Sequence, residues 1–148
     1  PGMSDRDKGV RDAILMSLRG RVKSLKTEEL GELVGSPYAD VRIFAGQTLL
    51  TADQEAFDQY GFDLLIDEDT VVRSTTLRAM GVRRVTGWVR IMSRSLLDED
   101  YVIQRVAMDA LLTDRHEGVK ALKEYVARNP QARISALARA ELDRLGVR

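Results

Sequence analysis

The amino-acid sequence repeats itself at a step of 31 residues. Starting from Ser36, the step reaches Asp67, Asp98 and Asn129, and one step back reaches Asp5. All five belong to the residue types that favour the N-cap of a helix. Two apolar columns follow in every copy: Val10, Val41, Val72, Ile103 and Ile134, then Leu18, Leu49, Met80, Leu111 and Leu142. The period predicts a repeat architecture in which each copy opens with a helix, and the residue of the N-cap type caps that helix.

Each complete copy is expected to contain a second helix. In the first copy it covers residues 27–34. In the next three its apolar stripe has helical spacing: Phe57, Tyr60 and Leu64; Trp88, Ile91 and Met92; Val119, Leu122 and Val126. A small-residue column in the opening helices allows close helix approach: Ala45, Thr76, Ala107 and Ala138. No single helix pair could bury its stripe alone, so the copies should stack on one another.

We therefore expect an all-α fold, a right-handed α-solenoid of stacked antiparallel helix hairpins with about nine helices. It should form one domain over residues 1–148, with repeats at 5–35, 36–66, 67–97 and 98–128 and a half repeat at 129–148. Polar outer positions of the half repeat suit an element that caps the array: Arg139, Glu141, Asp143 and Arg144. Pro1 and Gly2, ahead of Met3, look like a tag remnant.

Composition narrows the possible chemistry. Of 148 residues, 44% are apolar and 31% charged, a balance typical of globular domains. Lysine plus arginine and aspartate plus glutamate number 23 each, so net charge gives little drive toward nucleic acid or anionic membranes. The absence of cysteine excludes disulfides and thiolate metal ligands. No apolar run approaches the ~20 residues needed to cross a bilayer. We expect a cytoplasmic protein without membrane contact.

Residues 67–81 and 98–112 resemble HEAT repeats, in particular the short HEAT-like repeats of the phycobilisome-lyase type. Both begin with Asp-Glu and continue with Ala or Thr, Ala and Leu or Met at helical spacing. The resemblance covers nearly the whole chain and implies a solenoid, in a family that includes adaptors, bilin lyases and hydroxylases. A hydroxylase branch holds di-iron through several His-Glu pairs. This chain has a single histidine, in His116-Glu117, so we expect no metal and no cofactor.

One basic column is expected to be structural. It follows the Val/Ile column and consists of Arg11, Arg42 and Arg73, continued by Gln104 and Ser135. In HEAT arrays such arginines bond carboxylates and carbonyls at the turns of adjacent repeats. The available carboxylate partners are Asp40, Asp67 and Asp98. Trp88 lies on the second-helix stripe, and we expect it in the core rather than against a ligand.

The balanced net charge hides two blocks of opposite sign. Residues 43–72 contain seven acidic side chains and no basic one, whereas residues 70–97 contain six arginines and no acidic one. Arg90 and Arg94 share one helix face. The second helices of HEAT arrays line a concave surface, and one column there reads Glu32, Asp63, Arg94 and Tyr125.

Two interpretations of these charges remain open. In the first, Asp63 pairs with Arg94 and Asp53 with Arg84 as a ladder between repeats, which suits Arg84 best. In the second, the arginines are exposed and bind a carboxylate or phosphate through the planar guanidinium, which suits Arg90 best.

The pattern contains no catalytic constellation, so we expect a scaffold or adaptor rather than an enzyme. Its partner would be another protein, bound on the concave face of the second helices by Arg90, Arg94, Arg83, Asp63, Tyr125 and Glu32. One alternative is that the arginine-rich third repeat binds nucleic acid or another anionic ligand. A further alternative is a bilin-lyase-like enzyme or tetrapyrrole handler.

Overall fold

The computed structural model describes residues 7–147 and is all-helical over that range. It contains nine α-helices and one 3-10 helix: α1 (Lys8–Arg19), η2 (Val22–Ser24), α2 (Thr27–Val34), α3 (Ala39–Thr48), α4 (Gln54–Leu65), α5 (Thr70–Arg83), α6 (Trp88–Ser95), α7 (Tyr101–Leu112), α8 (Glu117–Arg128) and α9 (Arg133–Arg144). Within these residues there is no strand, and no helix has both the length and the apolar character needed to cross a membrane. The predicted all-α class is confirmed.

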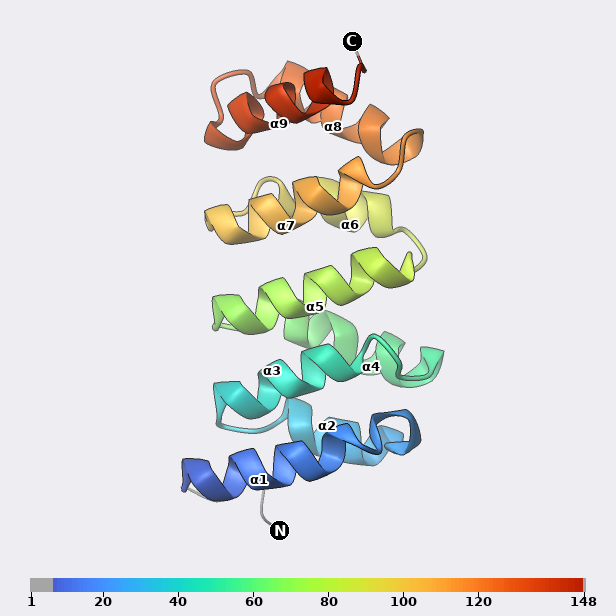
Figure 1. Ribbon diagram of the computed structural model, residues 1–148, viewed down its shortest axis with the longest axis vertical. Helices are drawn as coiled ribbons and strands as arrows, with labels where there is room; N and C mark the ends of the chain where they lie inside the picture. Colours follow the sequence, from blue (N-terminus) through green and yellow to red (C-terminus); the bar gives the residue numbers. More distant parts are fainter. Residues whose placement is uncertain (1–6, 148) are drawn as a thin grey trace. The chain divides into compact units, whose positions relative to one another are not determined.

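The chain divides into two compact parts, one that ends at Ala79 and one that begins at Met80, inside α5. In the N-terminal part, α1 packs on α3, and α2 packs on α3 and α4. In the C-terminal part, α6 packs on α8, α7 packs on α9, and α7 also meets α6 and α8. Alternate helices therefore form two layers within each part (Figure 1). We call α1, α3, α5, α7 and α9 the first helices, and α2, α4, α6 and α8 the second helices.

The apolar columns of the first helices form the core from the second copy onward. Val41, Val72, Ile103 and Ile134 are at most 2% exposed, and the small-residue column is completely buried. The approach at this column is close, because a Cβ added to the neighbouring Gly46 would lie 2.9 Å from the Thr76 hydroxyl oxygen. The predicted core positions of these four copies are confirmed.

The first copy differs from that pattern. Val10 is 41% exposed, and the buried residues of α1 are Arg11 and Leu15. These two lie one helical turn apart and share a stripe, and Arg11 reaches Asp40 at the start of α3. The prediction that Val10 belongs to the buried stripe is therefore wrong, because α1 packs through the neighbouring stripe.

Three residues of the predicted N-cap column form turns that precede the helices instead of capping them. The side-chain oxygens of Ser36, Asp67 and Asp98 accept hydrogen bonds from the amide two residues later, at 3.2, 2.8 and 2.8 Å. Helices α3, α5 and α7 each begin three residues after that column. Such side-chain turns compete with capping for the same residue types.

The caps themselves come from residues that the column did not include. Asp100 accepts from the Val102 amide at the start of α7, and Asp69 accepts from the Val71 and Val72 amides at the start of α5. Asp7 caps α1. The predicted cap Asp5 and the predicted tag remnant Pro1-Gly2 lie outside the described residues.

The second helices bury most of the stripe that was predicted for them. Phe57 and Leu64 of α4, Trp88 and Met92 of α6, and Val119 and Leu122 of α8 are all buried. Tyr60, Ile91 and Val126 are only partly buried. The prediction that Trp88 is a core residue is confirmed.

Candidate interaction site on the second helices

The arginines of the column on the first helices form hydrogen bonds and ion pairs within the fold. Arg11 donates to Asp40 Oδ2 from Nε and Nη2 at 3.2 and 3.1 Å. Arg42 binds Asp67 in a bidentate manner, with Nε to Oδ2 at 2.7 Å and Nη2 to Oδ1 at 3.1 Å. The Arg42 and Asp67 side chains are only 11% and 10% exposed. Burial raises the pKa of Asp67, but hydrogen bonds from Arg42 and the Asp69 amide lower it further, so this pKa lies below its ordinary value of 3.8.

The same column also holds the turns that precede the helices. Arg42, Arg73, Gln104 and Ser135 each donate to the carbonyl oxygen six residues earlier, at distances of 3.0, 2.8, 2.7 and 2.7 Å. Three kinds of side chain therefore satisfy the same turn carbonyl in successive copies. The structural interpretation of this column is confirmed.

Arg84 also forms hydrogen bonds within the fold. Its Nη1 donates to Asp114 Oδ2 at 3.0 Å, and its Nη2 donates to the Thr113 side-chain oxygen at 3.1 Å. The guanidinium also lies 4.4 Å from the centroid of the Trp88 ring, in cation–π geometry. The ladder interpretation named Asp53 as the partner of Arg84, and this pairing is wrong: Arg84 binds Asp114, 30 residues further along the chain. The Asp53 carboxylate caps α4 by accepting from the Ala56 amide at 2.7 Å.

The predicted partner-binding residues fall into two groups. Glu32 of α2 and Asp63 of α4 are exposed in the N-terminal part. Arg90 and Arg94 are exposed on α6 in the C-terminal part, and neither makes a hydrogen bond or ion pair with the described residues. Arg83, at the end of α5, is partly buried.

Tyr125 is much less accessible than a contact residue of an open surface. It is 9% exposed, and its hydroxyl donates to the Leu96 carbonyl oxygen at 2.9 Å. Burial raises the pKa of Tyr125 above its ordinary value of 10.0. Only part of its ring remains available to a ligand, and that part lines a pocket.

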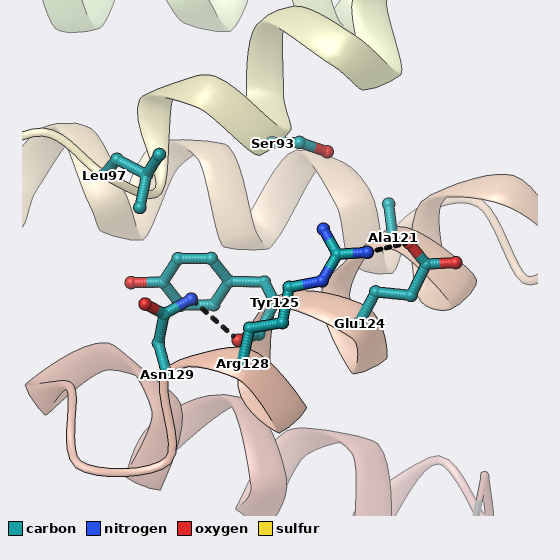
Figure 2. A pocket seen from close by; sticks show the side chains of 7 residues that line it. All are labelled: Ser93, Leu97, Ala121, Glu124, Tyr125, Arg128 and Asn129. Carbon is teal, nitrogen blue, oxygen red and sulfur yellow. Dashed lines mark hydrogen bonds and ion pairs between the residues drawn. The ribbon is translucent and has the colours of Figure 1, made fainter.

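The pocket lies between α6 and α8 and has a volume of about 200 Å³. Its lining residues are Ser93, Leu97, Ala121, Glu124, Tyr125, Arg128 and Asn129. In Figure 2 the Arg128 side chain extends beside the Tyr125 ring toward Glu124, while Leu97 and Ser93 lie across the pocket on the α6 side. A wholly apolar cavity of ~150 Å³ holds one benzene molecule, so this hollow has room for one apolar or aromatic side chain.

The local sequence explains why the hollow exists. Ser93 and Ala121 are small side chains on packed helices, and the Ser93 hydroxyl turns back to the Val89 carbonyl of its own helix at 2.8 Å. The Arg128–Glu124 pair at the rim is exposed and long, with 3.7 Å between nitrogen and oxygen. Asn129 Nδ2 donates to the Tyr125 carbonyl oxygen at 3.0 Å. The rim therefore offers a guanidinium that an incoming carboxylate could engage at little energetic cost.

The sign of the charge on the second helices differs between the N-terminal and the C-terminal part of the chain. Helices α2 and α4 together carry six acidic residues and no basic one. Helices α6 and α8 carry five basic residues and two acidic ones, Glu117 and Glu124. The basic residues are Arg90, Arg94, Lys120, Lys123 and Arg128. The C-terminal pocket thus opens on a surface that favours an anionic partner.

Most pocket residues were not foreseen from the sequence. Tyr125 was named, but Ser93, Leu97, Arg128 and Asn129 were not, because a hollow between helices depends on side-chain packing rather than on a motif. Comparing the columns for unusually small residues on facing second helices would have identified Ser93 and Ala121.

Comparisons with known proteins give no match: no protein-family model, no curated protein and no solved structure matches this chain. Among residues 7–147, no three histidine, cysteine, aspartate or glutamate side chains gather in a way that could hold a metal ion.

Proposed function

We propose that this protein is a HEAT-like α-solenoid that binds another protein on the concave face of its second helices. The solenoid is supported by the burial of the same columns in successive copies and by the two helix layers within each part. The binding role is carried by one observation: the α6–α8 pocket has the exposed Arg128 in its lining, and Arg90 and Arg94 on α6 make no hydrogen bond or ion pair with the described residues.

The residues around this pocket favour a partner with an apolar side chain next to carboxylates. Ser93 and Leu97 line the pocket, and Arg90 and Arg94 are their neighbours three residues away on α6. An apolar side chain would fill the hollow against the Tyr125 ring, and carboxylates beside it would meet guanidinium groups in bidentate geometry. Pockets that become tightly packed and desolvated on binding provide much of the energy of protein interfaces.

A capture experiment with charge-reversed protein tests the proposal. The tagged protein, its R90E/R94E variant and the matched control R78E/R105E are incubated with lysate of the source organism, and bound proteins are identified by mass spectrometry. The control changes charge by the same amount on the exposed faces of first helices α5 and α7. We expect specific partners in the wild-type and control samples that are missing with R90E/R94E. Capture of the same proteins by R90E/R94E would refute this site.

The nucleic-acid alternative relies on the same arginine-rich repeat, but Arg73 and Arg84 of that repeat are already bonded within the fold. Mixed-sequence duplex DNA in low salt distinguishes the two functions. Binding that weakens steeply as salt is added would support the nucleic-acid function. We expect no such binding.

A further inference from the structure

Helix α4 carries an exposed apolar stripe that its own fold leaves uncovered. Phe62 is 55% exposed and Ile66, just beyond the helix end, is 79% exposed. They are four residues apart and therefore lie on one side of the helix. Asp58, one turn before Phe62, and Asp63 are also exposed. Exposed apolar side chains that are grouped and rimmed by charge mark interaction surfaces.

The α4 stripe and the α6–α8 pocket have complementary properties. The pocket has room for one aromatic ring and opens on a surface with an excess of basic residues. The stripe presents a phenyl ring from a helix with three acidic residues and no basic one. One surface is a hollow and the other an exposed ring, both have an apolar part, and their charges are opposite in sign. Complementary charge steers association and suppresses other pairings.

We infer that the pocket binds a second copy of this chain, with Phe62 of one copy in the α6–α8 pocket of the other. Asp58 and Asp63 of α4 then face Arg90 and Arg94 of α6. This inference rests on the proposed role of the pocket as a protein-binding site and identifies the occupant. Each copy has both surfaces, so each chain can offer Phe62 to one pocket and accept a Phe62 in its own.

Charge exchange between two variants gives the sharpest test, and it uses purified full-length protein only. R90E/R94E makes the pocket surface acidic, and D58R/D63R makes the α4 surface basic. Each variant alone sets like charges against each other, so we expect monomers by light scattering after size exclusion. In an equimolar mixture both contacts become complementary again, and we expect the mass of the wild-type oligomer to return.

A second set of variants tests the ring itself. F62A removes the phenyl group, and S93L fills the pocket from the α6 side. We expect each to weaken the self-association constant at least about tenfold, a change well within the reach of a single interface residue. M16A is the matched control, because Met16 is an exposed apolar residue on first helix α1. Unchanged thermal unfolding of F62A shows that the loss is not a folding defect.

The outcomes separate this inference from the proposed function. A wild-type protein that stays monomeric up to about 1 mM, or a mixture that fails to restore the oligomer, overturns the inference. If lysate partners still depend on Arg90 and Arg94 in that case, the pocket binds a different protein and the proposed function stands. If they do not, both fail.

Discussion

Replacing Arg42 by methionine should destabilise the N-terminal part by about 3 kcal/mol, because it leaves the Asp67 carboxylate largely buried without its cation. Three hydrogen bonds disappear: the two to Asp67, at 2.7 and 3.1 Å, and the one to the Ser36 carbonyl oxygen at 3.0 Å. Breaking a fully buried pair costs about 3–5 kcal/mol. The low end applies because both side chains keep about a tenth of their surface exposed.

Urea unfolding followed by circular dichroism at pH 7 measures this loss. The double variant R42M/D67N removes the charge on both sides and should recover about half of the deficit or more, since no buried charge remains unpaired. R105M is the matched control: Arg105 also contacts an aspartate, Asp109 at 3.0 Å, but both side chains are about half exposed. We expect R105M to unfold like the wild type. An R42M variant that also unfolds like the wild type would contradict the structural role of the column.

The same pair predicts how the deficit varies with pH. The pKa of Asp67 is depressed in the folded protein below 3.8. Its contribution to stability is therefore complete above that ordinary value and is lost as the pH falls through the folded-state pKa. In R42M the carboxylate is protonated more easily, so the stability difference between wild type and R42M should narrow from pH 7 to pH 3. A difference that widens on acidification would refute this assignment.

Two further predictions concern the C-terminal part. G118A should lower the free energy of unfolding in urea by about 2–3 kcal/mol, because the added Cβ collides with the Leu111 carbonyl oxygen and cannot be accommodated without moving backbone. The control G20A, whose Cβ meets nothing closer than 3.7 Å, should have a small effect. Equal effects of the two variants would contradict this packing. Y125F should cost about 1–2 kcal/mol by leaving the Leu96 carbonyl without its donor. Because the pKa of Tyr125 is raised above 10.0, its stabilising effect is present below that value and declines as pH rises through the folded-state pKa. The difference between the ultraviolet titrations of wild type and Y125F should give a Tyr125 ionisation displaced to higher pH.

Column patterns predicted those features of the fold that depend on burial. An apolar side chain at helical spacing has few alternatives to the core, so Val41, Val72, Ile103 and Ile134 could be assigned correctly from the sequence. The Arg42–Asp67 pairing was also foreseeable, since an arginine beside a buried column must find acceptors. The assignment failed at Val10, where the first copy packs through a different stripe.

Features decided by competition between neighbouring polar groups were not predictable in the same way. Asp67 and Asp69 are both suitable caps, and the sequence does not say which carboxylate faces the helix amides. In the structure Asp67 accepts from the Asp69 amide, while Asp69 accepts from the amides of Val71 and Val72. Arg84 likewise had a plausible partner in sequence, yet its hydrogen bonds are to Thr113 and Asp114. The pocket depends on how two helices pack, which no single column records.

Comparison of equivalent positions indicates where function can reside in such a chain. Columns that hold the turns keep one task in every copy, even when arginine is replaced by Gln104 or Ser135. The outward positions of the second helices have no such constraint. Sixty-two residues, or two repeats, separate Phe62, Asp63 and Ile66 of the α4 stripe from Glu124, Tyr125 and Arg128 of the pocket wall. The same three positions therefore form an exposed acidic stripe in one copy and, around the buried Tyr125 ring, part of the pocket wall in another. A repeat that varies only there can generate two complementary surfaces without disturbing its core, and a second copy of the chain supplies a partner for both.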